Sequence, residues 1–155
     1  MMINLIETYE VKADSKGRFM VPSGLKKQLQ PILNEGFVLK RSIFRNCLEL
    51  FPMSEWNKES ESLGQLNRFV KENNDFIRAF MAGVRMIGID TAGRIQIPKD
   101  LVNYAGIKKN LVISSAINRL EIWDKEAYES TLNDPDVDFG SLAEKVMGHA
   151  GSGNE

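Results

Sequence analysis

The sequence has too few nucleophilic and metal-binding side chains for most enzymatic chemistry. It contains one cysteine, Cys47, and one histidine, His149, in 155 residues. A single cysteine cannot form an intrachain disulfide, so we expect Cys47 to be a buried thiol in a reducing cytoplasm. His149 lies in a glycine-rich stretch, where nothing rigid would orient it as a catalytic base. These two residues also cannot complete a structural zinc site, so the composition predicts neither an enzyme nor a metalloprotein.

Long apolar runs and phosphate-binding loops are also missing. No window approaches the eighteen apolar residues of a membrane span, and the N-terminus does not resemble an export signal. No glycine-rich loop ends in Lys-Ser or Lys-Thr, so we expect no nucleotide cofactor. The carboxylates of Asp134, Asp136 and Asp138 lack the glycine and distal glutamate of an EF-hand. We therefore expect a cytoplasmic protein without cofactor, metal ion, small-molecule substrate or membrane partner.

The net charge is only −1, but the charges are unevenly distributed along the chain. Residues 10–46 have a balance of +5, whereas residues 120–155 have a balance of −7. The basic side chains of the first segment are Lys12, Lys16, Arg18, Lys26, Lys27, Lys40, Arg41 and Arg45. Such polarity is typical of nucleic-acid binding but also of ordinary solvated surfaces, so the positions of the charges must decide.

An internal repeat organises the chain. Asp14-Ser-Lys-Gly-Arg18-Phe-Met-Val-Pro22 recurs as Asp90-Thr-Ala-Gly-Arg94-Ile-Gln-Ile-Pro98, an offset of 76 residues. A second pair, Asn46-Cys-Leu-Glu-Leu-Phe51 and Asn118-Arg-Leu-Glu-Ile-Trp123, recurs at an offset of 72. Two matches in the same order indicate a duplicated unit. We predict a first repeat with a helical extension over 1–80, a second with C-terminal helices over 81–148, and a flexible tail over 149–155.

Turn residues and apolar periodicity predict a βαββ order in each repeat, followed by helices. Residues 14–17 and 90–93 should be turns, because Asp bonds to nearby backbone amides and Gly adopts positive φ. Alternating apolar residues on both sides of each turn predict the arms of a hairpin. Pro22 and Pro98 then suit the entry to helices. Helices are predicted over 23–30 and 99–105, and second hairpins from 37–40 with 47–51 and from 111–114 with 120–123.

The connection over residues 54–82 contains apolar and aromatic residues at helical spacing. It predicts two helices that are separated at Asn73-Asn74. Because of this spacing, we interpret its aromatic side chains as core or subunit contacts, not as a platform for stacking nucleotides. After the second repeat, Asp124 can cap a helix over 124–132, and a further helix is predicted over 142–147.

With both D-x-x-G-R motifs in place, the sequence resembles the MraZ family over nearly its whole length. The resemblance implies an α+β fold of two tandem AbrB-like swapped-hairpin units that form a pseudo-dimer within one chain. It also implies a regulator of the division and cell wall gene cluster, which binds tandem promoter repeats as a ring-shaped homo-oligomer near the nucleoid. A physical reason for the fold is that each repeat of about 75 residues is marginal alone, so interlocking gives both a shared core.

The motif suggests how double-stranded DNA is recognised. Arg18 and Arg94 follow tight turns on ribbons that can enter the major groove, where an arginine fork binds guanine O6 and N7. Phosphate contacts are assigned to Lys12, Lys16, Lys26 and Lys27. Asp14, Gly17, Asp90 and Gly93 are assigned to turn structure. Since the second motif has Ala92 in place of Lys16, we expect the first repeat to dominate.

Two alternatives remain open at this stage. The arginines could pair only with Asp14 and Asp90 across the turns, although an exposed pair contributes only ~0–1 kcal/mol and gives little reason to build the turn twice. The acidic C-terminal segment also suits an antitoxin-like or other protein-interaction module of the AbrB group. A gel shift with upstream DNA distinguishes the two, because a regulator is expected to bind this DNA.

Overall fold

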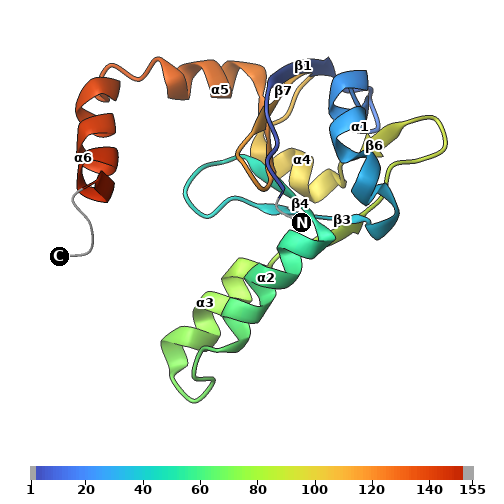
Figure 1. Cartoon of the computed structure of the whole chain (residues 1–155). Coiled ribbons are helices and arrows are strands. Elements are labelled where there is room, and N and C mark those ends of the chain that lie inside the picture. Colours follow the sequence, from blue (N-terminus) through green and yellow to red (C-terminus); the bar gives the residue numbers. More distant parts are fainter. Residues whose placement is uncertain (1–2, 152–155) are drawn as a thin grey trace. The chain divides into compact units, whose positions relative to one another are not determined.

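The computed structural model describes residues 3–151, and the side chains of residues 3–148 (Figure 1). The chain divides into one compact unit that ends at Lys125 and a second that begins at Glu126. In the part of the chain that the structure describes, no helix has the length and apolar character needed to cross a bilayer.

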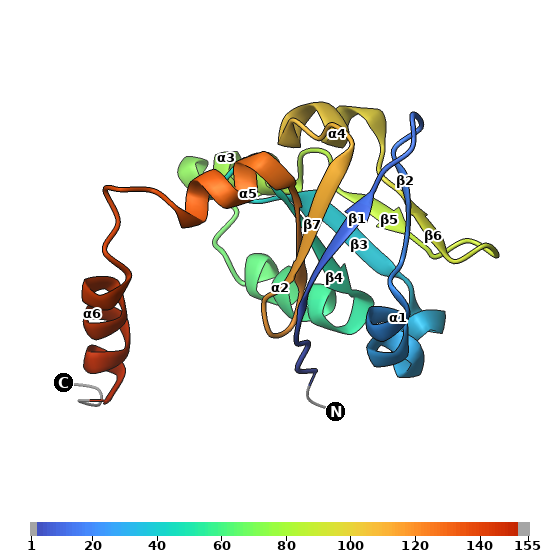
Figure 2. The ribbon, with the colours of Figure 1, turned by 90° about the horizontal axis from the view of Figure 1, so that it is seen from above.

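The first unit contains all eight strands of the described chain. They are β1 (Thr8–Lys12), β2 (Arg18–Met20), β3 (Phe37–Arg41), β4 (Leu48–Pro52), β5 (Arg85–Ile87), β6 (Arg94–Gln96), β7 (Asn110–Ser115) and β8 (Leu120–Asp124). Six strands form an antiparallel sheet in the order β1-β7-β8-β4-β3-β5, and β2 pairs with β6 in a separate ribbon (Figure 2).

The two repeats exchange strands. β1 of the first repeat pairs with β7 of the second, with Tyr9 opposite Ile113, and β5 of the second pairs with β3 of the first, with Val38 opposite Met86. At the centre of the sheet, β4 and β8 lie side by side, and each is the equivalent of the other at the repeat offset of 72. The predicted α+β fold with an intrachain pseudo-dimer is therefore confirmed.

The prediction that the two arms of each turn pair mainly with each other is wrong. After the first turn, the arms share only the bridge between Ala13 and Phe19 and the bond from Asp14 N to Arg18 O. β2 then pairs with β6 of the other repeat. The alternating pattern requires one apolar face to be buried, and a strand from either repeat satisfies this requirement.

The short helices after the prolines lie where they were predicted. α1 spans Ser23–Leu29 and continues into a 3-10 helix, η1 (Gln30–Glu35), which the sequence analysis did not predict. α4 spans Lys99–Ala105 and ends at Gly106, whose φ of +62° is left-handed. Both helices bury leucines, Leu25 and Leu101 among them, against the core.

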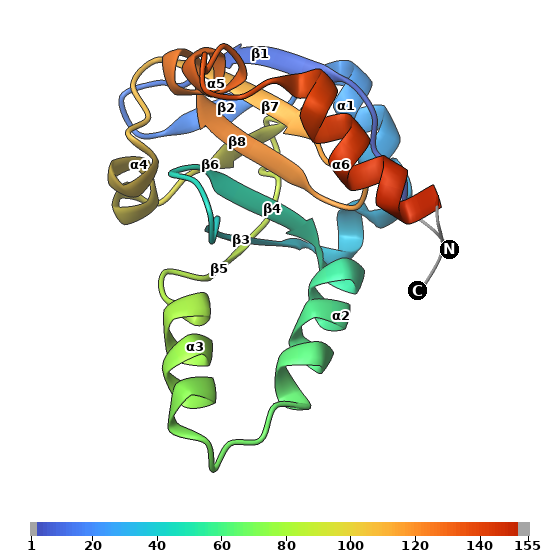
Figure 3. The same ribbon diagram turned by 90° about the vertical axis from the view of Figure 1, so that its left-hand side faces the viewer.

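The long connection forms two helices, α2 (Met53–Gly64) and α3 (Lys71–Met81), which lie side by side and project from the sheet (Figure 3). The predicted break at Asn73-Asn74 is wrong, because the chain reverses before α3 begins. The two asparagines lie in the first turn of α3, where their side-chain amides donate to Asn67 O and Arg68 O. Asparagine is common both in turns and near helix N-termini, so the sequence alone placed the break a few residues late.

Apolar residues of both repeats form one continuous core. Its buried members include Phe19, Leu25 and Leu50 from the first repeat and Ile95 and Ile122 from the second. A smaller cluster of Val38, Phe51 and Trp56 lies where α2 and α3 join the sheet. The Trp56 ring stacks on Phe80 with centroids 6.1 Å apart. Trp56 and Phe80 therefore belong to the core, as their helical spacing predicted.

The second unit contains α5 (Lys125–Leu132) and α6 (Phe139–Gly151). The first residue of α5 is the last residue of the first unit. α6 includes the helix predicted over 142–147. Between α5 and α6, Asp134 accepts a bond from the Asp136 backbone amide, and Asp138 accepts one from the Ser141 hydroxyl. Residues 149–151 of the tail expected to be flexible are the end of α6, and residues 152–155 lie outside the described part.

Candidate nucleic-acid interface

The β2–β6 ribbon brings the two motif arginines onto one face. Its register places Arg18 opposite Gln96, Phe19 opposite Ile95, and Met20 opposite Arg94. Phe19 and Ile95 are each 2% exposed and face the core. Because side chains alternate along a strand, the other four residues of the ribbon lie on its outer face.

The same register sets the spacing of the arginines. Arg18 and Arg94 are diagonal neighbours across the ribbon, which corresponds to roughly 7–8 Å between their backbones. A two-stranded ribbon fits the major groove of B-DNA. The ribbon therefore presents two guanidinium groups on one outer face, and it is built from both repeats, whereas the sequence predicted a separate ribbon in each.

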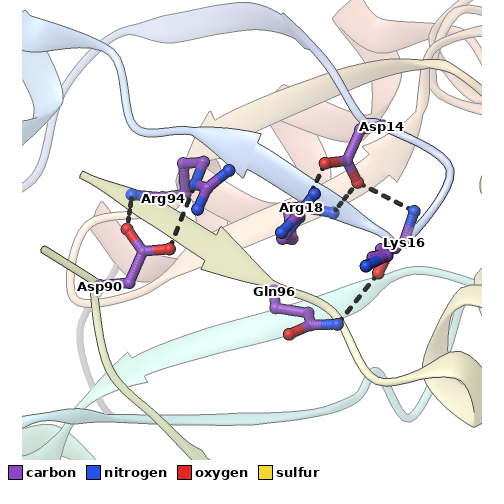
Figure 4. A network of polar contacts seen from close by, with 6 residues as sticks. All are labelled: Asp14, Lys16, Arg18, Asp90, Arg94 and Gln96. Atoms are coloured by element: carbon purple, nitrogen blue, oxygen red, sulfur yellow. Dashed lines mark hydrogen bonds and ion pairs between the residues drawn. The ribbon is translucent and has the colours of Figure 1, made fainter. Parts of the chain in front are cut away.

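Each arginine emerges from a turn that an aspartate organises (Figure 4). One carboxylate oxygen of Asp14 accepts bonds from the backbone amides of Lys16 and Arg18, both at 2.9 Å. Asp90 does the same for Ala92 at 2.9 Å and Arg94 at 2.8 Å. The chain then reverses at Gly17 and Gly93, which have φ of +78° and +84°. These are left-handed conformations that favour glycine.

The same hydrogen bonds lower the pKa of both aspartates. The backbone amide of Arg18 is the largest cause for Asp14, and that of Arg94 is the largest for Asp90. Bonds to the ionised form make deprotonation easier. Both carboxylates are therefore charged at neutral pH and available to pair with the arginines.

Both ion pairs weighed from the sequence exist, and each engages only one edge of its guanidinium. Arg18 Nε lies 2.7 Å from Asp14 Oδ2, and Arg94 Nε lies 3.2 Å from Asp90 Oδ2. Among the described residues, the terminal nitrogens of both arginines have no protein partner. The pairing therefore leaves a donor fork free, and a role in the turn does not exclude contact with a base.

The four lysines assigned to phosphate contacts are all exposed, and two of them lie beside different turns. Lys16 lies within the first turn, and Lys12 lies at the end of β1. Lys26 and Lys27 are in the last turn of α1. Lys26 Nζ lies 3.7 Å from the position that a Cβ on Gly93 would take, so this lysine of the first repeat lies beside the second turn.

Sequence reasoning missed the cations that the second repeat contributes beside the first turn. A hollow of about 530 Å³ there is bordered by Lys16, Gly17, Lys99 and Lys108. Gln96 lies at the same place, and its amide donates to Lys16 O at 3.2 Å. The sequence does place Lys99 just after Pro98, at the start of the predicted helix that became α4. It does not show that this helix lies beside the turn of the other repeat, which is known only from the fold.

Of the two residues considered for catalysis, only Cys47 has a described side chain. Cys47 is fully buried, and burial raises the pKa of its thiol to about 12. The His149 side chain lies outside the described residues. Among the side chains of residues 3–148, no three His, Cys, Asp or Glu residues are grouped as metal ligands.

Two AbrB-like units with exchanged strands in one chain, each presenting an Asp-buttressed arginine, define a tandem swapped-hairpin protein. The profile of the family described as "MraZ protein, putative antitoxin-like" matches residues 5–79 and again residues 80–145. The chain belongs to the MraZ family of transcriptional regulators.

Relatives named Transcriptional regulator MraZ align over nearly the whole chain. The protein of Christiangramia forsetii is 62% identical over 148 residues, which are 96% of each chain. That of Flavobacterium psychrophilum is 57% identical over 148 residues, 96% of this chain and 94% of the relative. That of Bacteroides thetaiotaomicron is 34% identical over 147 residues, 94% of both.

Proposed function

We propose that this chain regulates transcription by binding double-stranded promoter DNA, with Arg18 and Arg94 reading base edges from the β2–β6 ribbon. One observation supports this most strongly: the two arginines share the outer face of one ribbon, and each is paired through Nε alone. The aspartates limit the conformations of the side chains, so less entropy is lost when the forks meet guanine.

The surrounding lysines supply the affinity that does not depend on sequence. Lys12, Lys16, Lys26 and Lys27 are exposed, with Lys16 in the first turn and Lys26 beside the second, so they can contact backbone phosphates. The target, by resemblance to the family, is the division and cell wall gene cluster with its tandem promoter repeats, and the protein acts at the nucleoid in the cytoplasm. Repeated operator sites suit a homo-oligomeric ring, because weak contacts add when several ribbons bind together.

The test is a gel shift with the DNA upstream of the gene for this chain, compared with a scrambled duplex of equal length. The proposal expects a slower complex on the upstream DNA at concentrations that leave the scrambled duplex free. An antitoxin-like module would instead require a protein partner and would show no such preference.

Binding should weaken steeply as salt rises, because lysine contacts with phosphates release counterions. Each phosphate contact contributes about −0.9 to the slope of log affinity against log salt concentration. Lys16→Ala should lower affinity for specific and non-specific DNA alike and should reduce the slope by about one. Fluorescence anisotropy between roughly 50 and 200 mM salt measures both effects. Affinity that did not change over this range would exclude the phosphate contacts.

The chain should self-associate, because α3 and the adjoining loop expose apolar side chains. Phe69 is 88% exposed, Phe76 is 44% exposed and Met81 is 41% exposed. Such a patch is typical of an interaction surface. Light scattering should give a mass well above the 17.5 kDa of one chain. Phe76→Glu should lower that mass without loss of secondary structure, whereas a monomeric parent protein would contradict the expectation.

A further inference from the structure

Each turn packs against the part of the other repeat that contains its first helix. The amide of Ile97 donates to Gly17 O at 2.9 Å, and the amide of Val21 donates to Gly93 O at 3.0 Å. A Cβ on Gly17 would lie 3.3 Å from Val102 Cγ2 of α4, as one on Gly93 would lie 3.7 Å from Lys26 Nζ of α1. Positions 26 and 102 are equivalent at the repeat offset of 76, so strand exchange places the same helix position beside each turn.

The two turns obtain their nearest lysine in different ways. The first has Lys16 within the turn and Val102 at the helix position, whereas the second has Ala92 within the turn and Lys26 at the helix position. Lys16 and Lys26 are exposed, and neither forms an ion pair with any described residue. The difference between Lys16 and Ala92 therefore does not leave the second turn without a cation.

The first turn gains a further cation from the second repeat. Lys99, at the start of α4, is exposed and borders the hollow beside Lys16 and Gly17. Like Lys16, it has no ion-pair partner among the described side chains. Ammonium groups close to the turn of an outward-facing arginine are well placed for the phosphates that flank a contacted base.

We propose that the phosphate contacts beside each turn come in part from the other repeat: Lys26 serves the Arg94 turn, and Lys99 serves the Arg18 turn. This inference rests on the proposed DNA-binding function. It adds which lysines contact the phosphates beside each of the two arginines. It also means that the charge around each turn comes from both repeats, and not only from the repeat that contains the turn.

The first test measures the salt dependence of binding to a duplex that the parent protein selects from a random pool. Lys26→Gln should reduce the magnitude of the log–log slope by about one. Lys71→Gln is the matched control, because Lys71 lies on α3 and pairs with Asp75. It should leave the slope unchanged. Adding Ala92→Lys to Lys26→Gln should restore the slope, because it gives the second turn the lysine that the first turn has.

The second test combines variants in double-mutant cycles. Lys26→Gln and Arg94→Ala should together weaken binding by less than the product of their separate effects. Either change alone already weakens the contact between the second turn and the DNA, so the other then removes less. With Arg18→Ala, the combined effect should equal the product to within about twofold. Lys99→Gln should show the reverse pattern, coupling to Arg18→Ala and not to Arg94→Ala.

The outcomes separate this inference from the proposed function. If the arginine variants weaken binding while Lys26→Gln behaves like Lys71→Gln, or couples to Arg18→Ala, the assignment of lysines across repeats is wrong and DNA binding stands. If neither arginine variant weakens binding to the selected duplex, the proposed function fails, and this inference fails with it.

Discussion

Arg18→Ala and Arg94→Ala should each weaken binding to the operator by about 5- to 150-fold, which corresponds to the ~1–3 kcal/mol of a bidentate guanine contact. Both effects should be measurable, because each turn has a lysine beside it, and that of Arg18→Ala should be larger, because Lys99 also borders the first turn. Each change should also relax the preference at one base position. Lysine should not restore it, because an ammonium lacks the two parallel donors of a guanidinium. Anisotropy titrations against operator variants measure the affinity and the preference.

The control for these variants is Arg85→Ala. Arg85 forms an exposed ion pair with Asp100 at 3.0 Å, but it lies on β5, a strand of the six-stranded sheet and not of the β2–β6 ribbon. Its removal takes away the same charge and a comparable pair, so it should leave the base preference unchanged. Circular dichroism and oligomer mass should match the parent protein for all three variants, since exposed ion pairs contribute little to stability. Equal losses from Arg85→Ala and Arg18→Ala would mean that the arginines act only through net charge.

Gly17→Ala should destabilise the fold by about 2–5 kcal/mol, a larger effect than that of the equivalent change in the second repeat. Its left-handed backbone disfavours any L side chain by ~1–2 kcal/mol. The added Cβ would also lie 2.8 Å from the backbone oxygen of Ile97, which cannot move without disturbing the strand exchange. Overpacking of this kind typically costs a further ~1–3 kcal/mol.

Gly93→Ala is the matched comparison. Its Cβ would meet only the flexible ends of Met20 and Lys26, at 3.4 and 3.7 Å. We therefore expect only the backbone penalty of ~1–2 kcal/mol. Chemical denaturation at equal protein concentration measures both variants. Equal destabilisation would show that the first turn is not packed more tightly than the second.

Much of the fold could be predicted from the sequence, because the repeat contains residue types with strong local conformational preferences. Asp and Gly at fixed positions specify the turns, Pro22 and Pro98 specify the helix starts, and Gly106 specifies a helix end. A duplicated pattern then implies two similar units with a shared core. The structure has these turns and helix ends at the predicted positions, because the tertiary contacts favour the same local conformations.

The strand exchange could not be derived from the pattern alone. Alternation shows that Phe19 and Val21 face a core, but it is equally satisfied when the partner strand belongs to the same repeat or to the other. This ambiguity led to the prediction of two separate ribbons. The site depends on the exchange, since Arg18 and Arg94 share one face only because β2 pairs with β6.

The most direct test of base readout changes one acceptor atom of the DNA. Each guanine of the selected duplex is replaced in turn by 7-deazaguanine, which keeps O6 but lacks the N7 acceptor. Binding of the parent protein should weaken at two or more guanines. Arg18→Ala should be insensitive to the replacement at one of them and Arg94→Ala at another. If both variants keep the full sensitivity of the parent protein at every guanine, these arginines do not read the bases, and the central claim is wrong.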